Sequence, residues 1–471
     1  MLGFTNIPQE YPLVRDAKKR SKDFSEIYEN FAAEKAKEQA DRCSQCGVPF
    51  CQIACPLQNN IPDWLKLTAE GRLEEAYAIS SATNNFPEIC GRICPQDRLC
   101  EGDCVVEKDF GAVTIGSIEK YITETAFANG WVKPVSPMSE NGSSIGIIGA
   151  GPAGLAAAEM LRRKGYGVHI YDRYDRAGGL LVYGIPSFKL EKEMVLRRHA
   201  LLSASGIIFH LGVDIGWDIS FADLRAKHDA VLIATGVYKA REPEIPNSSL
   251  AGVVQALPYL TASNKQNLGD KVPEFEDGSL NAAGKSVVVI GGGDTAMDCV
   301  RTAIRQGAKS VTCLYRRDRA NMAGSAREVK NAEEEGVKFS WLAAPKAFVG
   351  DKKLNQILVQ QMRLTTHDSA GRQSVVPVEG EVFPVAADMA ICALGFEAEA
   401  IPAMFAEPNL QVRKSGTIAV DKNMMTSVEG VFAAGDIVRG ASLVVWAIKD
   451  GREAAERIHQ YVSVKTRVDA A

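Results

Sequence analysis

Eight of the eleven cysteines of this chain lie between Cys43 and Cys104, in two groups of four. Four thiolates form the ligand set of one four-iron cluster, so the count predicts two such clusters. Group 1 comprises Cys43, Cys46, Cys51 and Cys55, and group 2 comprises Cys90, Cys94, Cys100 and Cys104.

Three other interpretations of these cysteines compete with iron–sulfur clusters. A disulfide framework requires an oxidising compartment, and residues 1–20 contain no apolar signal core. Structural zinc sites usually pair two tight knuckles, whereas only Cys43 and Cys46 form one here. Scattered buried thiols would not concentrate in one segment. Iron and sulfide therefore remain the strongest interpretation.

The spacing of both groups resembles the bacterial ferredoxin pattern. In that pattern three close thiolates bind one cluster, and a remote cysteine beside a proline completes the other. The resemblance implies that the two groups exchange one ligand each, which would couple cluster assembly to folding. Cys43, Cys46 and Cys51 would then share a cluster with Cys104, and Cys90, Cys94 and Cys100 would share the other with Cys55.

The first of two dinucleotide-binding motifs contains Gly149, Gly151 and Gly154 between an apolar strand and a helix. The first glycine permits a tight turn, the second lets a pyrophosphate approach the backbone, and the third brings the helix close to the strand. Asp172 ends the next predicted strand, where its carboxylate can accept hydrogen bonds from a ribose. Together these features favour a nucleotide site over a glycine-rich turn without a ligand.

The second motif places Gly291, Gly293 and Ala296 at the equivalent positions. Arg316 and Arg317 follow its second strand, where an NAD site usually carries an acid. Guanidinium groups at this position favour the 2′-phosphate of NADPH through charge-assisted hydrogen bonds. The alternative is a solvated basic turn, and an acid at the next position weakens the preference for NADPH over NADH.

A third motif near the C-terminus, the sequence AAGD, contains Gly435 and Asp436. A Gly-Asp pair after a strand is by itself more often a turn. In this order of motifs it resembles the C-terminal motif of flavoproteins with two dinucleotide domains, which implies that Asp436 binds a flavin ribityl hydroxyl. A helix starting near Ser442 would point its N-terminus at the flavin ring. The first motif is thus expected to hold FAD.

These motifs predict an α/β protein with two Rossmann-like domains behind a mostly helical iron–sulfur domain. Apolar residues recur at helical spacing before the linker-like segment 131–144, which is rich in Pro, Ser, Asn and Gly. The expected domains are 1–142 for the clusters, 143–280 and 393–471 for FAD, and 281–392 for NADPH.

Composition agrees with an ordinary globular protein. The 471 residues are 46% hydrophobic and 24% charged, and the length predicts about three domains. The formal net charge of −4 provides no basic field for nucleic acid or an anionic membrane. No uninterrupted apolar run approaches the roughly 18 residues of a membrane span. We therefore expect a cytoplasmic protein that binds neither nucleic acid nor membrane.

Long blocks across nearly the whole chain, including ADRCSQCGVPFCQIACP and AAGDIVRGASLV, resemble the small (beta) subunits of bacterial NADPH-dependent glutamate synthases. The resemblance implies an electron-input subunit in which NADPH gives hydride to FAD and two [4Fe-4S] clusters carry electrons away. Flavin converts electron pairs to single electrons. The implied partner is a large (alpha) subunit, carrying FMN and an iron–sulfur cluster, that makes L-glutamate from L-glutamine and 2-oxoglutarate.

Two alternatives remain open. One is the NADPH-oxidising subunit of a dihydropyrimidine dehydrogenase or a related oxidoreductase. Its relatives replace one cluster cysteine by glutamine, whereas Cys90 completes a set of eight here, which favours glutamate synthase. The other is a redox-sensing scaffold without catalysis. Rapid bleaching of the flavin by NADPH would exclude the scaffold.

Site residues are assigned to cofactors only, because hydride passes between cofactors and needs no protein acid or base. The six histidines show no ligand or triad pattern. The residues expected to bind FAD are Gly149, Gly151, Pro152, Ala153, Gly154, Asp172, Gly179, Leu180, Thr235, Gly236, Gly435 and Asp436. Those expected to bind NADPH are Gly291, Gly293, Asp294, Thr295, Ala296, Arg316 and Arg317.

Overall fold

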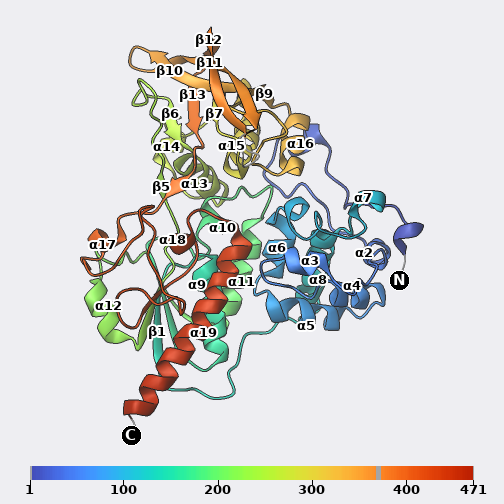
Figure 1. Cartoon of the computed structure of the whole chain (residues 1–471), viewed down its shortest axis with the longest axis vertical. Coiled ribbons are helices and arrows are strands. Elements are labelled where there is room, and N and C mark those ends of the chain that lie inside the picture. Colours follow the sequence, from blue (N-terminus) through green and yellow to red (C-terminus); the bar gives the residue numbers. More distant parts are fainter. Residues whose placement is uncertain (1–2, 368–372, 470–471) are drawn as a thin grey trace.

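The computed structural model describes residues 3–367 and 373–469. Figure 1 shows a helical N-terminal part beside a domain crossed by the long C-terminal helix, with a second sheet-containing domain above both. The predicted class, a helical domain followed by two parallel-sheet α/β units, is confirmed. None of the described helices is long and apolar enough to cross a membrane.

The N-terminal domain is built from short helices around one apolar core. Trp64, Ile118 and Ile122 are fully buried in it, and several of the predicted cluster cysteines pack against it. Its elements are η1 (Gly3–Thr5), α1 (Ala17–Arg20), α2 (Ala33–Asp41), α3 (Phe50–Ala54), α4 (Ile61–Ala69), α5 (Leu73–Thr83), α6 (Pro87–Ile93), η2 (Gln96–Arg98), α7 (Glu107–Phe110) and α8 (Ile115–Ala128).

The second domain contains a five-stranded parallel sheet in the order β15-β4-β1-β2-β3. Because β15 pairs with β4, the C-terminal segment rejoins the sheet that the first dinucleotide motif began, as predicted. Its strands are β1 (Ser144–Ile148), β2 (Gly167–Asp172), β3 (Ile208–Leu211), β4 (Ala230–Ile233) and β15 (Val431–Ala433). Its helices are α9 (Pro152–Arg163), α10 (Leu180–Tyr183), α11 (Lys192–Ala204), α12 (Phe221–Lys227), α17 (Ile401–Met404), α18 (Asp436–Arg439) and α19 (Val444–Asp469).

The third domain has its own parallel sheet in the order β6-β13-β7-β8-β9, flanked by an antiparallel sheet β10-β11-β12. Buried apolar residues such as Ile290 and Phe348 join the two sheets. The strands are β6 (Val253–Gln255), β7 (Ser286–Ile290), β8 (Ser310–Tyr315), β9 (Lys338–Trp341), β10 (Ala343–Gly350), β11 (Leu354–His367), β12 (Gln373–Ala386) and β13 (Met389–Cys392). The helices are α13 (Ala256–Asn267), α14 (Pro273–Glu276), α15 (Asp294–Arg305) and α16 (Ala326–Glu334).

Strand pairing moves one expected domain boundary. Strand β6 lies within the segment 143–280 assigned to the FAD domain, yet it pairs with β13 of the other sheet. The chain crosses between the two domains at β5 (Lys239–Ala240) and returns at β14 (Phe396–Glu397), and these two strands pair with each other. The third domain therefore begins soon after β5, well before residue 281, and the return crossing lies near the expected residue 393.

Candidate cofactor sites

Helix ends and tight loops position the eight cysteines. Cys51 lies in α3 and Cys55 is the residue that ends it, while Cys90 lies in α6 and Cys94 ends that helix. The prolines that follow Cys55 and Cys94 in the sequence help to stop each helix there. The remaining four, Cys43, Cys46, Cys100 and Cys104, lie in loops beside these helices.

The thiols fall into two neighbouring sets. Burial raises the pKa of Cys43 and of Cys51, and the nearby thiols of Cys104 and Cys46 add to the rise in both. Cys104 belongs to group 2 by sequence, so the structure brings it to three members of group 1. Ser44 also lies against this set, with its Oγ 3.0 Å from the sulfur of Cys46.

The second set receives Cys55 in return. Burial raises the pKa of Cys55 to about 11, and the thiol of Cys90 contributes to that rise. The neighbouring thiol of Cys90 acts to lower the pKa of Cys94, but burial and the nearby thiols of Cys100 and Cys55 raise it. Cys100 is coupled to both Cys55 and Cys51, so the two sets adjoin. Cys55 thus lies beside the thiols of group 2, and Cys104 lies beside those of group 1.

The donor chemistry of these sets suits iron–sulfur clusters. Within the described ranges, no three His, Cys, Asp or Glu side chains converge on a point where they could hold a single metal ion. A four-iron cluster instead takes its thiolates at separate irons, so its ligands surround a larger volume. A buried thiol needs a compensating positive charge to ionise, which bound iron provides.

The first dinucleotide turn has the geometry that its three glycines predict. Gly149 has φ +110°, and a Cβ there would lie 2.3 Å from the carbonyl oxygen of Ala234. A Cβ on Gly154 would lie 2.0 Å from the carbonyl oxygen of Gly149, so the helix approaches the turn closely. Open space surrounds Gly151, immediately before α9, which leaves room for a pyrophosphate at the helix N-terminus.

Most of the residues expected to bind FAD line one cavity in front of this turn. Thr235 Oγ1 is buried there and has no hydrogen-bond partner in the described part of the chain, which fits a polar group of a bound cofactor. Burial raises the pKa of Asp436, at the start of α18, to about 7. The expected residues that line the cavity are Gly149, Gly151, Pro152, Ala153, Asp172, Leu180, Thr235, Gly236 and Asp436.

The other three expected FAD residues support this cavity from behind. Gly154 packs under the turn, as described above. A Cβ on Gly179 would lie 3.0 Å from the Cα of Gly151, and one on Gly435 would lie 2.9 Å from the Cβ of Ala153. Helix α19 begins at Val444, two residues after the expected start near Ser442, and both residues line the cavity.

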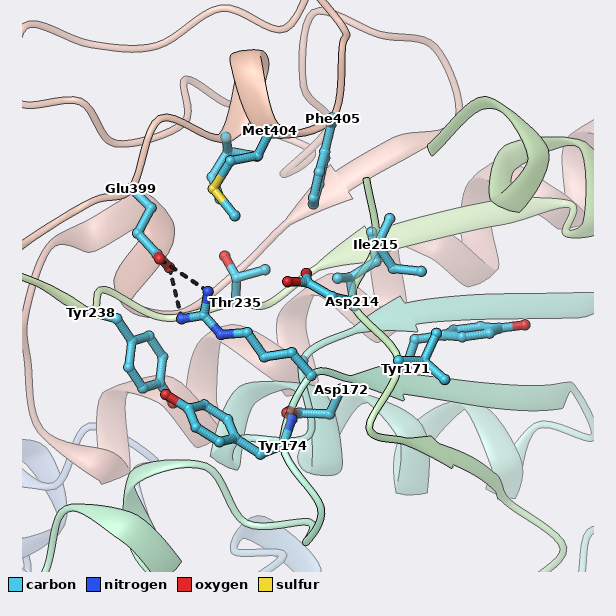
Figure 2. A pocket seen from close by; sticks show the side chains of 15 residues that line it. Tyr171, Asp172, Tyr174, Asp214, Ile215, Thr235, Tyr238, Glu399, Met404 and Phe405 are labelled. Carbon is cyan, nitrogen blue, oxygen red and sulfur yellow. Dashed lines mark hydrogen bonds and ion pairs between the residues drawn. The ribbon is translucent and has the colours of Figure 1, made fainter. Parts of the chain in front are cut away.

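A second hollow continues the FAD cavity beyond Asp172 (Figure 2). Asp172 Oδ2 accepts a hydrogen bond from the Ala150 amide at 2.6 Å, and Oδ1 accepts one from the Tyr174 amide at 2.8 Å. Each oxygen retains a lone pair for a ribose hydroxyl. The wall opposite is formed by Arg173, whose two terminal nitrogens donate to Glu399 at 3.0 Å each. The two hollows together provide an elongated site suited to a dinucleotide.

The second dinucleotide turn repeats the geometry of the first. Gly291 has φ +144°, and a Cβ there would lie 2.4 Å from the carbonyl oxygen of Ala393. Open space surrounds Gly293, which precedes the first residue of α15, Asp294. Ala296 is fully buried against the sheet. This turn therefore fits a second dinucleotide.

The arginines after β8 are free to meet an anion. Arg316 is exposed, and neither Arg316 nor Arg317 forms an ion pair with the part of the chain that is described. Arg317 Nε is buried and has no hydrogen-bond partner within residues 3–367 and 373–469. Asp318 forms no ion pair with either arginine within the described ranges, and its Oδ1 accepts hydrogen bonds from the Asn321 amide at 3.0 Å and side chain at 2.8 Å.

The three domains meet around a cavity of about 220 Å³. The cluster domain contributes Cys94, the FAD domain contributes Leu180 and Val444, and the third domain contributes Asp294 and Thr295 from the start of α15. Both Leu180 and Val444 also line the cavity in front of the first dinucleotide turn, so the two cavities adjoin.

Sequence reasoning missed two groups of residues. Lys189, in the junction, pairs with Asp298 at 2.8 Å and lies 3.8 Å from Glu328. Their separation along the chain left no local signal, although Asp298 lies one helical turn after Asp294. Three histidines also lie together although their sequence shows no pattern: His169 Nδ1 lies 3.1 Å from His210 Nε2, and the ring of His228 lies 5.2 Å from that of His169.

Comparison with known proteins finds two matching family models and a shared fold. Residues 20–131 match the family model described as dihydropyrimidine dehydrogenase domain II, 4Fe-4S cluster, and residues 143–451 match pyridine nucleotide-disulphide oxidoreductase. A structure of FprA from Mycobacterium tuberculosis in complex with NADPH shares the fold, with a TM-score of 0.59 at 19% identity over 69% of this chain and 86% of that one.

Several relatives match along nearly the full chain, and two of them illustrate the similarity. The NADPH glutamate synthase small chain of Azospirillum brasilense is 63% identical, covering 100% of this chain and 98% of the relative. That of Escherichia coli K12 is 45% identical, covering 98% of each. With its cluster domain and both dinucleotide turns in place, this chain belongs to the family of NADPH glutamate synthase small chains.

Proposed function

We propose that this chain is the electron-input subunit of a glutamate synthase, in which FAD accepts hydride from NADPH and [4Fe-4S] clusters carry the electrons onward one at a time. The junction cavity carries this proposal. It is lined by Cys94 of the cluster domain, by Leu180 and Val444 of the flavin cavity, and by Asp294 and Thr295 of the second nucleotide helix. This shared lining supports a hydride donor, a flavin and an electron acceptor that meet around one space.

The proposal assigns two clusters to the two sets of thiols. Each set contains four cysteines, one of which comes from the other sequence group, and the electrostatic coupling of Cys104 to Cys51 and of Cys55 to Cys90 supports that exchange. The FAD and NADPH residues named from the sequence are proposed in the same roles. The unpartnered Thr235 Oγ1 and Arg317 Nε support those two assignments.

We place the exit of electrons at the cluster bound by Cys43, Cys46, Cys51 and Cys104. Apolar side chains on the same segments are more than half exposed: Val48, Phe50, Ile53 and Val105 are 57%, 52%, 61% and 55% exposed. Apolar surface around a redox centre suits docking of a partner. The partner proposed here is the large subunit with FMN and an iron–sulfur cluster, in the reducing environment of the cytoplasm that free thiols require.

The direct test is reconstitution with that large subunit. NADPH, L-glutamine and 2-oxoglutarate should then give L-glutamate, and a variant with a charge at the exposed apolar face, Ile53→Glu, should lose coupled turnover while the isolated chain still oxidises NADPH with an artificial acceptor. Retention of full coupled turnover in Ile53→Glu would refute the exit face.

The match of residues 20–131 to the dihydropyrimidine dehydrogenase cluster domain favours one second candidate, a pyrimidine-reducing complex built on the same input module. Purification of the chain with its natural partner distinguishes the two. Recovery of a subunit that reduces pyrimidines, in place of one that hydrolyses glutamine, would replace the first proposal with the second.

A further inference from the structure

A cavity of about 410 Å³ lies away from the proposed cofactor sites, between the cluster domain and the FAD domain. Its walls come from α5, from the linker residues 131–138, and from helices α9 and α11. No residue expected to bind a cluster, FAD or NADPH lines it. The volume is in the range of small-molecule sites, so the character of the lining decides what it could hold.

The lining contains a buried carboxylate with one unsatisfied oxygen. Glu159, on α9, is only 4% exposed. Its Oε1 accepts hydrogen bonds from Arg163 Nη2 at 2.6 Å and Nε at 3.2 Å, whereas Oε2 is buried and has no hydrogen-bond partner among the described residues. Leaving a charged acceptor buried and unsatisfied is costly. A ligand N–H or O–H donor in this cavity would remove that cost.

Cations outnumber acids among the lining residues. Lys133, Arg163 and Arg198 face a single lining acid, Glu159. Arg198 is 5% exposed and is neutralised by Glu88, which lies behind it at 2.7 and 2.9 Å. Lys133 is exposed and forms no ion pair within the described ranges. A cavity with excess positive charge attracts anions.

An amide completes the polar lining. Asn85 is 4% exposed, and its Oδ1 accepts a hydrogen bond from Arg452 Nη1 at 2.7 Å. That bond leaves the two N–H groups of the Asn85 amide as donors for an anionic oxygen. The cavity thus offers hydrogen-bond donors and cations that could bind a ligand carboxylate. It also offers one free acceptor, Glu159 Oε2, that could bind a positively charged donor of the ligand.

We propose that this cavity binds an anionic α-amino acid, with its ammonium group at Glu159 Oε2 and its carboxylates at Lys133, Arg163 and the Asn85 amide. A dicarboxylate without an ammonium group would leave Glu159 Oε2 unsatisfied, and the negative charge of Glu159 would repel it. The choice of L-glutamate as probe rests on the proposed function, because it is the product of the proposed complex. A ligand bound here would bridge the cluster domain and helix α9, whose N-terminus is proposed to hold the FAD pyrophosphate.

The test is thermal unfolding of the full chain, with its cofactors bound, against increasing L-glutamate. L-Glutamate should raise the unfolding midpoint in a saturable way, whereas 2-oxoglutarate, which lacks the ammonium group, should not. Glu159→Gln should raise the L-glutamate concentration needed for half of the shift at least about tenfold, since a charge-assisted hydrogen bond is lost. The matched control Glu140→Gln, at an exposed partner of Arg162, should leave it unchanged.

Lys133→Ala, on the exposed linker, provides a second variant if Glu159→Gln folds poorly, and it should also weaken the response. Absence of a saturable shift with L-glutamate, an equal shift with 2-oxoglutarate, or an unchanged response in Lys133→Ala would overturn the site and leave a cavity filled with water only. Bleaching of the flavin by NADPH, measured on the same samples, reports the proposed function separately.

Discussion

Glu335 is the centre of a buried ionic cluster that ties the N-terminal segment to the third domain. Its carboxylate accepts hydrogen bonds from Arg301 at 2.8 and 2.9 Å, from Arg305 at 2.6 and 3.0 Å, and from Arg20 at 3.0 Å. Glu335→Gln would keep the shape of this side chain but remove the charge on which three arginines depend. We expect a large loss of stability.

The magnitude follows from the acidity of the group. Burial acts to raise the pKa of Glu335, but hydrogen bonds from Arg305 and Arg301 outweigh it and lower the pKa from 4.5 to about 2. That difference corresponds to about 3 kcal/mol of stabilisation by the charged form. Because the pKa is lowered on folding, this stabilisation is fully present above pH about 4.5 and is lost as the pH falls toward 2. Breaking a buried pair costs a similar amount, about 3–5 kcal/mol.

Thermal unfolding at pH 7.5, followed by tryptophan fluorescence, measures the loss of stability in Glu335→Gln. A loss of about 3 kcal/mol should lower the midpoint of the third domain by about 6–12 °C. The control Glu334→Gln removes a neighbouring carboxylate that is 42% exposed and pairs with Arg20, so it should cost less than about 1 kcal/mol. Equal midpoints for the two variants would refute the reasoning.

Three further predictions address the cofactor sites and pH. Replacing Arg316 and Arg317 by Ala should weaken the binding of NADPH by about 10- to 100-fold and that of NADH far less, as measured by steady-state kinetics. Equal losses for the two cofactors would exclude a 2′-phosphate contact. Cys55→Ala should remove the EPR signal of the cluster that Cys90 helps to bind and spare the other cluster, and the opposite pattern would disprove the exchange of ligands. Burial, helped by neighbouring cations, lowers the pKa of His228 to about 4, so stability should decline as the pH falls from about 6.5 toward 4. In His228→Asn that decline should flatten, and an unchanged slope would contradict this assignment.

Features set by neighbouring residues could be predicted from the sequence. The predicted turns require glycine at positions 149 and 291, because the backbone has positive φ there and a Cβ would collide with the carbonyl oxygens of Ala234 and Ala393. The expected helix near Ser442 begins at Val444, and both residues line the predicted flavin cavity. In each case strand, turn and helix are contiguous, so a local pattern is sufficient.

Features that depend on pairing between distant parts of the chain could not be predicted from the sequence. Strand β6 is only three residues long, and nothing in its sequence indicates that it pairs with β13, which lies more than a hundred residues further along the chain. The His169 and His210 contact likewise depends on the parallel alignment of β2 and β3. The Lys189 and Asp298 pair joins two domains. Such contacts arise from sheet order and domain packing, which spacing along the chain does not encode.

The central claim is that one chain takes hydride from NADPH into FAD and delivers single electrons to two clusters. Anaerobic titration of the purified chain with NADPH, together with iron, sulfide and flavin analysis, tests it most directly. The account predicts one FAD, about eight iron and eight sulfide per chain, and flavin bleaching within the time of mixing. About four iron per chain, or a flavin that stays oxidised in excess NADPH, would contradict it.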